Sequence, residues 1–272
     1  MIDKKLIGRG RTGEVYEWEE NRILKLFYST FPAGGVKQES DIGALLNESG
    51  INAPVCYGPV SVDGRNGIVY QKIEGISLLR LIEKSPWRIV EYSKHLARLH
   101  HDLHQVSFDK LPSQKKSMGY AMGVAKDKLG AHYQPLTEQM ALIEGGTAIC
   151  HGDFHPDNIL VNRDASIIID WMTAVSGNPM ADVARSWLIF KSPYIPEHSP
   201  LYVRLLSKLL KSIIARAYLG EYLKLSGISF QAVKTWMPLV AAARLFENVP
   251  GEEKWLLGII ERSSRERQRS KV

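Results

Sequence analysis

The strongest constraint on the fold is a change of sequence texture close to Gly75. The residues before it form short apolar or alternating runs between turn residues, which is typical of β-strands. One stretch, residues 36–50, differs because Ile42, Leu45 and Leu46 form an apolar stripe with helical spacing. After Gly75, helical patterns dominate. We therefore expect an α+β fold, with a small β-rich lobe that contains one helix and a larger, mainly helical lobe.

The same change assigns the lobes and their connection. We expect the N-terminal lobe over residues 1–70, a hinge over residues 71–75 and the C-terminal lobe over residues 76–272. A short β-rich segment, residues 147–170, interrupts the helical part. In the first lobe, the dipeptide Asp63-Gly64 is expected to form the turn between two strands.

Composition and charge exclude several classes of protein. The chain has 272 residues, of which 44% are hydrophobic and 24% are charged, as is usual for a globular protein with its own core. No apolar run approaches the roughly 20 residues of a membrane span, and the N-terminus has no apolar signal core. Cys56 and Cys150 show no paired spacing, which favours a reducing compartment. We expect a cytoplasmic protein without a membrane partner.

The basic C-terminal tail contributes to the net charge of +6. Residues 262–272 contain five basic residues and one acid. Such a run is usually a solvated chain end, and no aromatic residues are interleaved with it to stack on bases. A solvated end is therefore favoured over a contact with nucleic acid.

The segment HGDFHPDNIL, residues 151–160, concentrates proton carriers and oxygen ligands in a short stretch. It leads into an apolar strand at residues 159–161, and a second apolar strand follows at residues 166–169. If the two strands form an antiparallel hairpin centred on the polar turn between them, Ile159 pairs with Ile169.

The same register places Asn158 directly opposite Asp170. Opposed residues have Cβ atoms about 4.5–5.5 Å apart, so both side-chain oxygens could reach one Mg²⁺ ion. Asp153 precedes the pair by five residues and is expected to face whatever the metal holds. A hairpin with polar ends is the alternative for the Asn–Asp pair alone, and the added carboxylate favours the metal site.

Near the N-terminus, Gly8, Gly10 and Gly13 form the pattern G-x-G-x-x-G between two strand-like stretches. Glycines allow backbone amides to approach phosphate oxygens closely. No helix follows, so the pattern does not predict a dinucleotide-binding loop. A plain turn is the alternative.

Lys25 lies inside ILKLF, where both faces of the strand are apolar, so its ammonium is expected to point into the protein. A buried ammonium requires an anionic partner or ligand. Glu39 shares the helical stripe of Ile42 and Leu46 and is the partner expected. The alternative is that both side chains extend to solvent.

Together these features supply the parts that phosphoryl transfer needs. They are, in chain order, a phosphate cover, a charge clamp, a base and two metal ligands. HGDFHPDNIL, followed by IIIDWMTAVSGNPMADVA, resembles the signature of the aminoglycoside phosphotransferase and choline kinase group of the protein-kinase-like superfamily. The resemblance covers about residues 6–190. It implies a protein-kinase-like two-lobed fold and transfer of the γ-phosphoryl group of ATP, with Mg²⁺, to a hydroxyl of a small molecule.

The resemblance also implies roles for individual residues of the signature. Asp153 corresponds to the catalytic aspartate that orients and deprotonates the acceptor hydroxyl. Asn158 and Asp170 correspond to the magnesium ligands. Asp182 resembles the later aspartate that braces the catalytic loop.

On the nucleotide side, Lys25 would hold the α- and β-phosphates and would itself be kept in place by Glu39. The backbone of the turn that carries Gly8, Gly10 and Gly13 would cover the phosphates. The hinge backbone from Gln71 to Ile73 would bind adenine.

The histidines are interpreted as structural. His151 and His155 are expected to hold the loop backbone, because a carboxylate already fills the position of the base. His100, His101 and His104 lie near the end of a helix and are expected to have a structural role.

Two other functions are weighed against a small-molecule kinase. A protein kinase is disfavoured because no activation segment that ends in Ala-Pro-Glu is visible, and because Gly152, His155 and Met172 replace the Arg, Lys and Gly that protein kinases usually have. A catalytically silent nucleotide-binding regulator is disfavoured because the expected site residues are all present. From Trp171 onward the chain has fifteen Lys and Arg against eight Asp and Glu, which does not favour a polycationic acceptor. The acceptor itself stays unassigned.

Overall fold

The computed structural model describes residues 4–163, 165–194 and 201–269. The chain forms two compact units, one of residues Met1–Glu83 and Pro156–Ala174 and the other of residues Lys84–His155 and Val175–Val272. The first unit is built mainly of antiparallel strands and the second mainly of helices, so the expected α+β class is confirmed. The boundaries expected for the lobes and the hinge stay a prediction.

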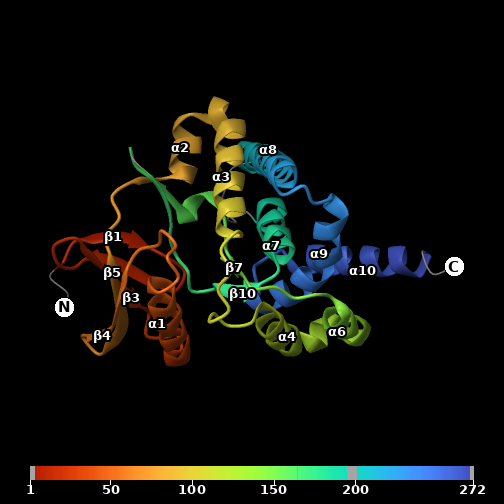
Figure 1. Cartoon of the computed structure of the whole chain (residues 1–272), viewed down its shortest axis with the longest axis horizontal. Helices are drawn as coiled ribbons and strands as arrows, with labels where there is room; N and C mark the ends of the chain where they lie inside the picture. The colour runs from red at the N-terminus through yellow and green to blue at the C-terminus, as the bar shows by residue number, and fades with distance from the viewer. Residues whose placement is uncertain (1–3, 164, 195–200, 270–272) are drawn as a thin grey trace. The chain divides into compact units, whose positions relative to one another are not determined.

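The first unit contains a five-stranded antiparallel sheet in the order β1-β2-β3-β5-β4. Helix α1 is the single long helix of this unit among the described residues (Figure 1). The bounds are β1 Leu6–Arg9, β2 Gly13–Glu17, β3 Arg22–Phe27, α1 Ala33–Asn47, β4 Cys56–Val62 and β5 Arg65–Gln71.

The two faces of this sheet carry separate apolar clusters because side chains alternate along each strand. On one face, Phe27 and Ile68 pack with Val36 of α1. On the other face, Leu24 and Leu26 are fully buried. The alternation along β3 therefore places Lys25 on the same face as Phe27, the face that α1 covers.

The turn between β4 and β5 has the expected position and chemistry. Asp63 and Gly64 have φ values of 51° and 73°, the left-handed region that a tight two-residue hairpin turn requires. The following pairing, Val62 with Arg65, closes the hairpin. This prediction is confirmed.

A second, three-stranded sheet of the first unit has the order β6-β8-β9, and here the predicted register is wrong. The strands are β6 Ile76–Ser77, β8 Ile159–Val161 and β9 Ser166–Ile168, and Ile159 pairs with Ile168 rather than with Ile169.

The pairing of Asn162 with Ala165 accounts for this one-residue difference. The backbone N–H of Asn162 donates to the carbonyl of Ala165 at 3.0 Å, and the side-chain Oδ1 of Asn162 accepts from the N–H of Ala165 at 2.8 Å. Because Asn162 lies opposite Ala165, the ladder that continues from them places Ile159 opposite Ile168, whereas pairing of Ile159 with Ile169 would centre the turn on residue 164, which lies outside the described residues. Asn158 consequently lies opposite Ile169, whose N–H donates to the backbone carbonyl of Asn158 at 2.9 Å.

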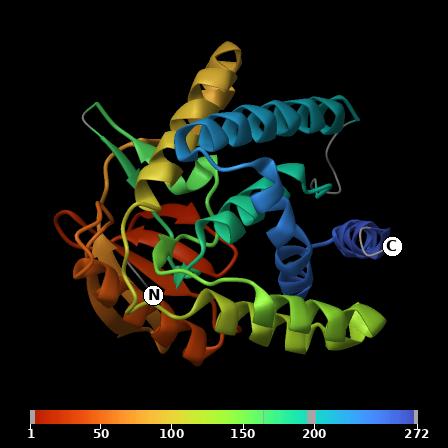
Figure 2. The same cartoon turned by 45° about the vertical axis from the view of Figure 1, so that its right-hand side comes forward.

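The second unit consists of helices around one short strand pair. Helix α3 packs against α8, and α7 packs against both α8 and α9. Figures 1 and 2 both show α3 and α8 side by side. The long helices are α3 Ile89–Leu103, α4 Gln114–Val124, α6 Tyr133–Leu142, α7 Pro179–Lys191, α8 Leu201–Ser226, α9 Phe230–Arg244 and α10 Glu253–Arg269.

The strand pair consists of β7, Ala148–Cys150, and β10, Val175–Gly177, which are antiparallel. Strand β7 leads directly into HGDFHPDNIL, and β10 leads into α7. The pair therefore fixes the start of the signature next to the start of a helix that is buried along most of its length. Over the described residues, no helix is long and apolar enough to cross a membrane.

Candidate active site

Lys25 is the centre of the charged group in the first unit. Its Nζ donates to Glu39 Oε1 at 2.8 Å and to Asp170 Oδ1 at 2.9 Å. The Lys25 side chain is 14% exposed and that of Glu39 is 4% exposed. The expected ion pair between strand β3 and helix α1 is therefore present, and Asp170 joins it from the end of the β8–β9 hairpin.

The protonation of Lys25 follows from its two partners. Burial alone would lower its pKa, but the charges of Asp170 and Glu39 raise the pKa above the ordinary value. Tyr70 donates a further hydrogen bond to Glu39 Oε1 at 3.1 Å, which holds the carboxylate in place. Lys25 is thus a fixed cation at neutral pH.

Asp170 and Asn158 provide the oxygen atoms expected of a Mg²⁺ site. Asp170 has a φ of 62°, a left-handed conformation that ends the strand geometry, and its side chain is 42% exposed. Asn158 is 7% exposed and directly precedes β8. The backbone bond from Ile169 to Asn158 holds the two chain segments side by side. One carboxylate and one carboxamide fit Mg²⁺, which takes few protein ligands and completes its shell with water and phosphate.

The glycines of the first turn have different local reasons. A Cβ on Gly13 would lie 2.4 Å from the carbonyl oxygen of Leu26, so β2 can pack against β3 at this point only with glycine. A Cβ on Gly8 or Gly10 would meet no atom closer than 3.7 Å. Neither packing nor a left-handed φ therefore requires glycine at positions 8 and 10.

The expected adenine-binding segment begins at the end of β5. Gln71 closes that strand, and its N–H donates to the carbonyl of Val55 at 2.9 Å. The N–H of Lys72 donates to the carbonyl of Asn21 at 2.8 Å. Ile73 follows in the connection between β5 and β6. The start of this segment is thus tied to the sheet, and its role stays a prediction.

In the second unit, Asp153 lies on the loop after β7. His151 Nδ1 accepts a hydrogen bond from the N–H of Asp153 at 3.2 Å, and His155 Nε2 lies 3.5 Å from Asp153 Oδ2. Burial alone would raise the pKa of Asp153. The hydrogen bond from His155 and the charge of Arg185 act in the opposite direction, and the resulting pKa is below its usual value. Asp153 is therefore an ionised hydrogen-bond acceptor at neutral pH.

Asp182 holds the backbone of this loop. Its Oδ2 accepts from the N–H of His151 at 2.6 Å and its Oδ1 from the N–H of Gly152 at 3.0 Å. Asp182 lies in the first turn of α7 and is 1% exposed. Burial alone would raise its pKa, but His100 and His104 lower it well below its usual value. The contact with the loop agrees with the bracing role that the resemblance implies.

A second support of the loop was not expected from the sequence. Arg185, one turn after Asp182 on α7, donates from Nε to the carbonyl of Gly152, and its Nη1 lies 2.6 Å from Glu247 Oε1. Glu247 Oε2 in turn lies 3.1 Å from Arg244 Nη1. The only signal in the sequence is the one-turn spacing of Arg185 from Asp182, because its partner is 62 residues further along the chain.

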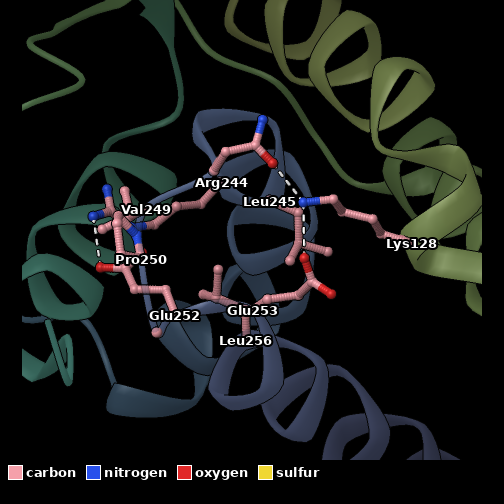
Figure 3. A pocket seen from close by; sticks show the side chains of 10 residues that line it. Lys128, Arg244, Leu245, Val249, Pro250, Glu252, Glu253 and Leu256 are labelled. Carbon is pink, nitrogen blue, oxygen red and sulfur yellow. Dashed lines mark hydrogen bonds and ion pairs between the residues drawn. The ribbon is translucent and has the colours of Figure 1, made fainter.

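The charged chain continues beyond Arg244. Glu252 receives two hydrogen bonds from Arg244, at 2.7 and 2.9 Å, and one from the hydroxyl of Ser192. Arg244 and Glu252 also line a cavity of about 190 Å³, where Lys128 contacts Asn248 and Glu253 (Figure 3). The polar groups drawn there bind one another, so the cavity adds no candidate catalytic group.

One further cluster has the composition of a metal site. His100, His104 and Asp182 are buried, and one nitrogen or oxygen atom from each lies within 4.8 Å of the others. The two histidines were expected to be structural, and the fold brings Asp182 to them from 78 residues away. The hydroxyls of Tyr218 and Tyr222 also form hydrogen bonds with the two rings.

Known proteins with a similar sequence or fold are phosphotransferases, in agreement with the geometry of the site. The sequence profile of the phosphotransferase enzyme family matches residues 5–206. No curated protein matches the sequence. Since the family match covers most of the chain, the protein belongs to the phosphotransferase enzyme family, and the expectation of a small-molecule kinase is confirmed.

Solved structures show the same fold at low sequence identity. The aminoglycoside phosphotransferase APH(4)-Ia has a TM-score of 0.64 and 12% identity, over 97% of this chain and 93% of that chain. Amicoumacin kinase hAmiN in complex with AMP-PNP, Ca²⁺ and Ami has a TM-score of 0.58 and 12% identity, over 95% and 87%. Choline kinase from Cryptosporidium parvum Iowa II has a TM-score of 0.55 and 14% identity, over 97% and 89%. The expected protein-kinase-like fold is thereby confirmed.

Proposed function

We propose that the protein transfers the γ-phosphoryl group of ATP, with Mg²⁺, to a hydroxyl group of a small molecule in the cytoplasm. The observation that carries this proposal is the group of Lys25, Glu39 and Asp170, in which a fixed cation is shared by a buried and an exposed carboxylate. An isolated structural ion pair needs no exposed third member. In a nucleotide site, an exposed carboxylate such as Asp170 can bind the Mg²⁺ ion that accompanies the phosphates.

On the nucleotide side, Lys25 would bind the α- and β-phosphates, while Glu39 keeps its ammonium on the α1 face of the sheet. Asn158 and Asp170 would hold Mg²⁺. The metal would neutralise charge that develops on the phosphate oxygens during transfer. The backbone around Gly8, Gly10 and Gly13 would cover the phosphates, and the backbone from Gln71 to Ile73 would bind the adenine.

On the acceptor side, Asp153 would accept a hydrogen bond from the hydroxyl that is phosphorylated. Its lowered pKa makes it a weak base, which suits a loose transition state in which the hydroxyl needs orientation before it needs deprotonation. Asp182 and Arg185 bind the backbone of Gly152 and so limit the movement of the next residue, Asp153. The acceptor class stays open.

The test is ADP release in the presence of MgATP and a library of hydroxyl compounds that includes antibiotics and metabolites. With the best acceptor, Asp153→Asn should lower turnover by about 100-fold or more, because an oriented catalytic base contributes roughly 10²–10⁴-fold. Nucleotide affinity, measured by calorimetry, should change little. Asp127→Asn, at an exposed carboxylate of the second unit, is the matched control and should retain turnover.

Unimpaired turnover in Asp153→Asn would refute the role of Asp153. Nucleotide binding without transfer to any compound would favour a silent regulator instead. Transfer of label from ATP to proteins and not to small molecules would favour a protein kinase.

A further inference from the structure

A buried polar network lies behind the catalytic loop and connects three helices of the second unit. Four of its five side chains come from α3, α7 and α8 and the fifth from His104, which directly follows the last residue of α3; each is at most 7% exposed. They are His100, His104, Asp182, Tyr218 and Tyr222. The proposed function uses only Asp182 of these, so the other four buried polar side chains need an explanation.

Each histidine uses both ring nitrogens. His100 Nε2 lies 3.0 Å from Asp182 Oδ2, and its Nδ1 lies 2.6 Å from the hydroxyl of Tyr218. His104 repeats the pattern, with Nε2 at 3.4 Å from Asp182 Oδ2 and Nδ1 at 2.6 Å from the hydroxyl of Tyr222. The two tyrosines and the two histidines are each one turn apart on α8 and α3, so the helices carry two parallel copies of one arrangement.

The direction of these hydrogen bonds follows from the chemistry of the carboxylate. An ionised carboxylate only accepts, so the nitrogen that faces it must carry the proton. The burial of His100 and the neighbouring His104 lower the pKa of His100 to about 3, so its ring is neutral and has one proton. That proton is on Nε2. Nδ1 is then an acceptor, and the tyrosine hydroxyl must be the donor.

Both carboxylate oxygens of Asp182 therefore accept hydrogen bonds. Oδ2 faces both histidines and the N–H of His151, while Oδ1 accepts from the N–H of Gly152. Without the histidine donors, the carboxylate could rotate away from the loop.

We propose that Tyr218 and Tyr222 are positioning residues for phosphoryl transfer. They fix His100 and His104 as Nε2–H tautomers, and the histidines fix the carboxylate that holds the loop of Asp153. This inference rests on the proposed function for its kinetic consequence, but the tautomers themselves do not depend on it.

A metal ion is the competing interpretation of the same cluster. It would need unprotonated Nε2 atoms on both rings and would turn the tyrosines into acceptors of Nδ1–H. Asp182 Oδ2 already accepts from a backbone N–H at 2.6 Å, so a metal ion would compete with the loop for this oxygen. The hydrogen-bonded network satisfies every one of these atoms without an ion.

The experiment compares Tyr218→Phe, Tyr222→Phe and the double variant with two controls. Ser93→Ala removes a buried hydroxyl of α3 that binds only the carbonyl of Ile89 among its described contacts, and Tyr120→Phe removes an exposed tyrosine hydroxyl. With the full-length protein, ¹⁵N NMR of the imidazole rings should show Nε2–H tautomers of His100 and His104 in the wild type. Each Tyr→Phe variant should shift the spectrum of its own histidine.

In steady-state kinetics, each single variant should lower kcat about three- to tenfold and the double variant further, while KM for ATP changes less than twofold. The controls should leave both unchanged, which separates positioning from a general loss of stability. Nδ1–H tautomers in the wild type, unaltered kcat in the folded double variant, or a stoichiometric metal ion released only on denaturation would each overturn the proposal. If no acceptor supports turnover at all, the proposed function fails, and the NMR result still decides the tautomers.

Discussion

The ion pair between Arg244 and Glu252 allows the energetics of the second unit to be tested at one position. Glu252 accepts from Nε and Nη2 of Arg244 at 2.7 and 2.9 Å, and from the hydroxyl of Ser192. The side chains of Arg244 and Glu252 are 8% and 1% exposed. The variant Glu252→Gln removes the charge with little change of volume and leaves the buried guanidinium with one anionic partner, Glu247 at 3.1 Å.

The expected cost follows from this burial. Removal of one partner of a buried pair typically destabilises a protein by about 3–5 kcal/mol, because an uncompensated charge remains. We expect about 3 kcal/mol, the lower end, since Glu247 still accepts from Arg244. For a domain of about 150–250 residues, each kcal/mol lowers Tm by about 2–4 °C, so Tm should fall by about 6–12 °C.

Urea unfolding followed by tryptophan fluorescence, together with calorimetric Tm, measures this effect. The control is Glu91→Gln in the exposed pair of Arg88 and Glu91, whose side chains are 47% and 60% exposed. This change should cost much less than Glu252→Gln, because solvent screens the exposed pair. The double variant Arg244→Met, Glu252→Gln should lose less unfolding free energy than the two single variants together, by at least about 1.5 kcal/mol. Equal effects of Glu252→Gln and Glu91→Gln would refute the reasoning that burial decides the cost.

Three further predictions concern the first unit and the buried histidines. Lys25→Met should weaken MgATP binding about tenfold to a hundredfold in calorimetry, because a hydrogen bond to a charged group contributes about 1.5–3 kcal/mol. An unchanged Kd would show that Lys25 does not bind the nucleotide. Gly13→Ala should destabilise the first unit by more than about 2 kcal/mol because its Cβ would lie 2.4 Å from a backbone oxygen, whereas Gly34→Ala, which has no atom within 4 Å, should be neutral or stabilising in the same urea titration. The pKa of His100, about 3 in the folded state against about 6.5 unfolded, means that the unfolded chain binds more protons between these values. The free energy of unfolding should therefore fall as pH decreases from 6.5, by up to about 1.4 kcal/mol per pH unit from this group, and His100→Gln should reduce that slope.

The Lys25–Glu39 pair shows what the sequence could predict about the site. An apolar strand with a single lysine and a helix with a single acid on its apolar stripe require a partner for each charge. Alternation along β3 and the helical period of α1 then place the two residues on facing surfaces, independent of how the strands connect. The contact at 2.8 Å confirms this inference, which needed only local periods.

The register of the β8–β9 hairpin shows where such reasoning fails. Strand periods identify which segments pair, but the register depends on which residues pair at the turn, and here Asn162 lies opposite Ala165, so that Ile159 pairs with Ile168. Asp170 leaves strand geometry altogether with its φ of 62°. Its proximity to Lys25 therefore does not follow from a ladder of opposed residues. The expected metal ligands lie at the end of the hairpin, but for a different geometric reason.

Long-range charges were beyond prediction for another reason. The sequence gives no sign that four charged residues of the second unit are buried or partly buried. Their local pattern is the same as that of the exposed pairs of α3 or α10. They are Arg185, Arg244, Glu247 and Glu252. Their burial depends on the contact of α7 with α9 and with the segment that precedes α10. Such contacts exist only after the helices have packed.

The conformation of the loop that carries Asp153 depends on residues outside the signature HGDFHPDNIL. Gly152 has a φ of 76°, and its N–H and carbonyl are bound by Asp182 and Arg185 from α7. HGDFHPDNIL therefore carries Asp153, the proposed catalytic residue, but other elements determine the conformation of its first residues. Since Asp182 is in turn surrounded by donors from α3, whose rings are oriented by α8, the geometry of Asp153 should respond to substitutions two contacts away. A search confined to the signature would miss these positions, and the hydroxyls of Tyr218 and Tyr222 are the ones at which the structure predicts the clearest effect.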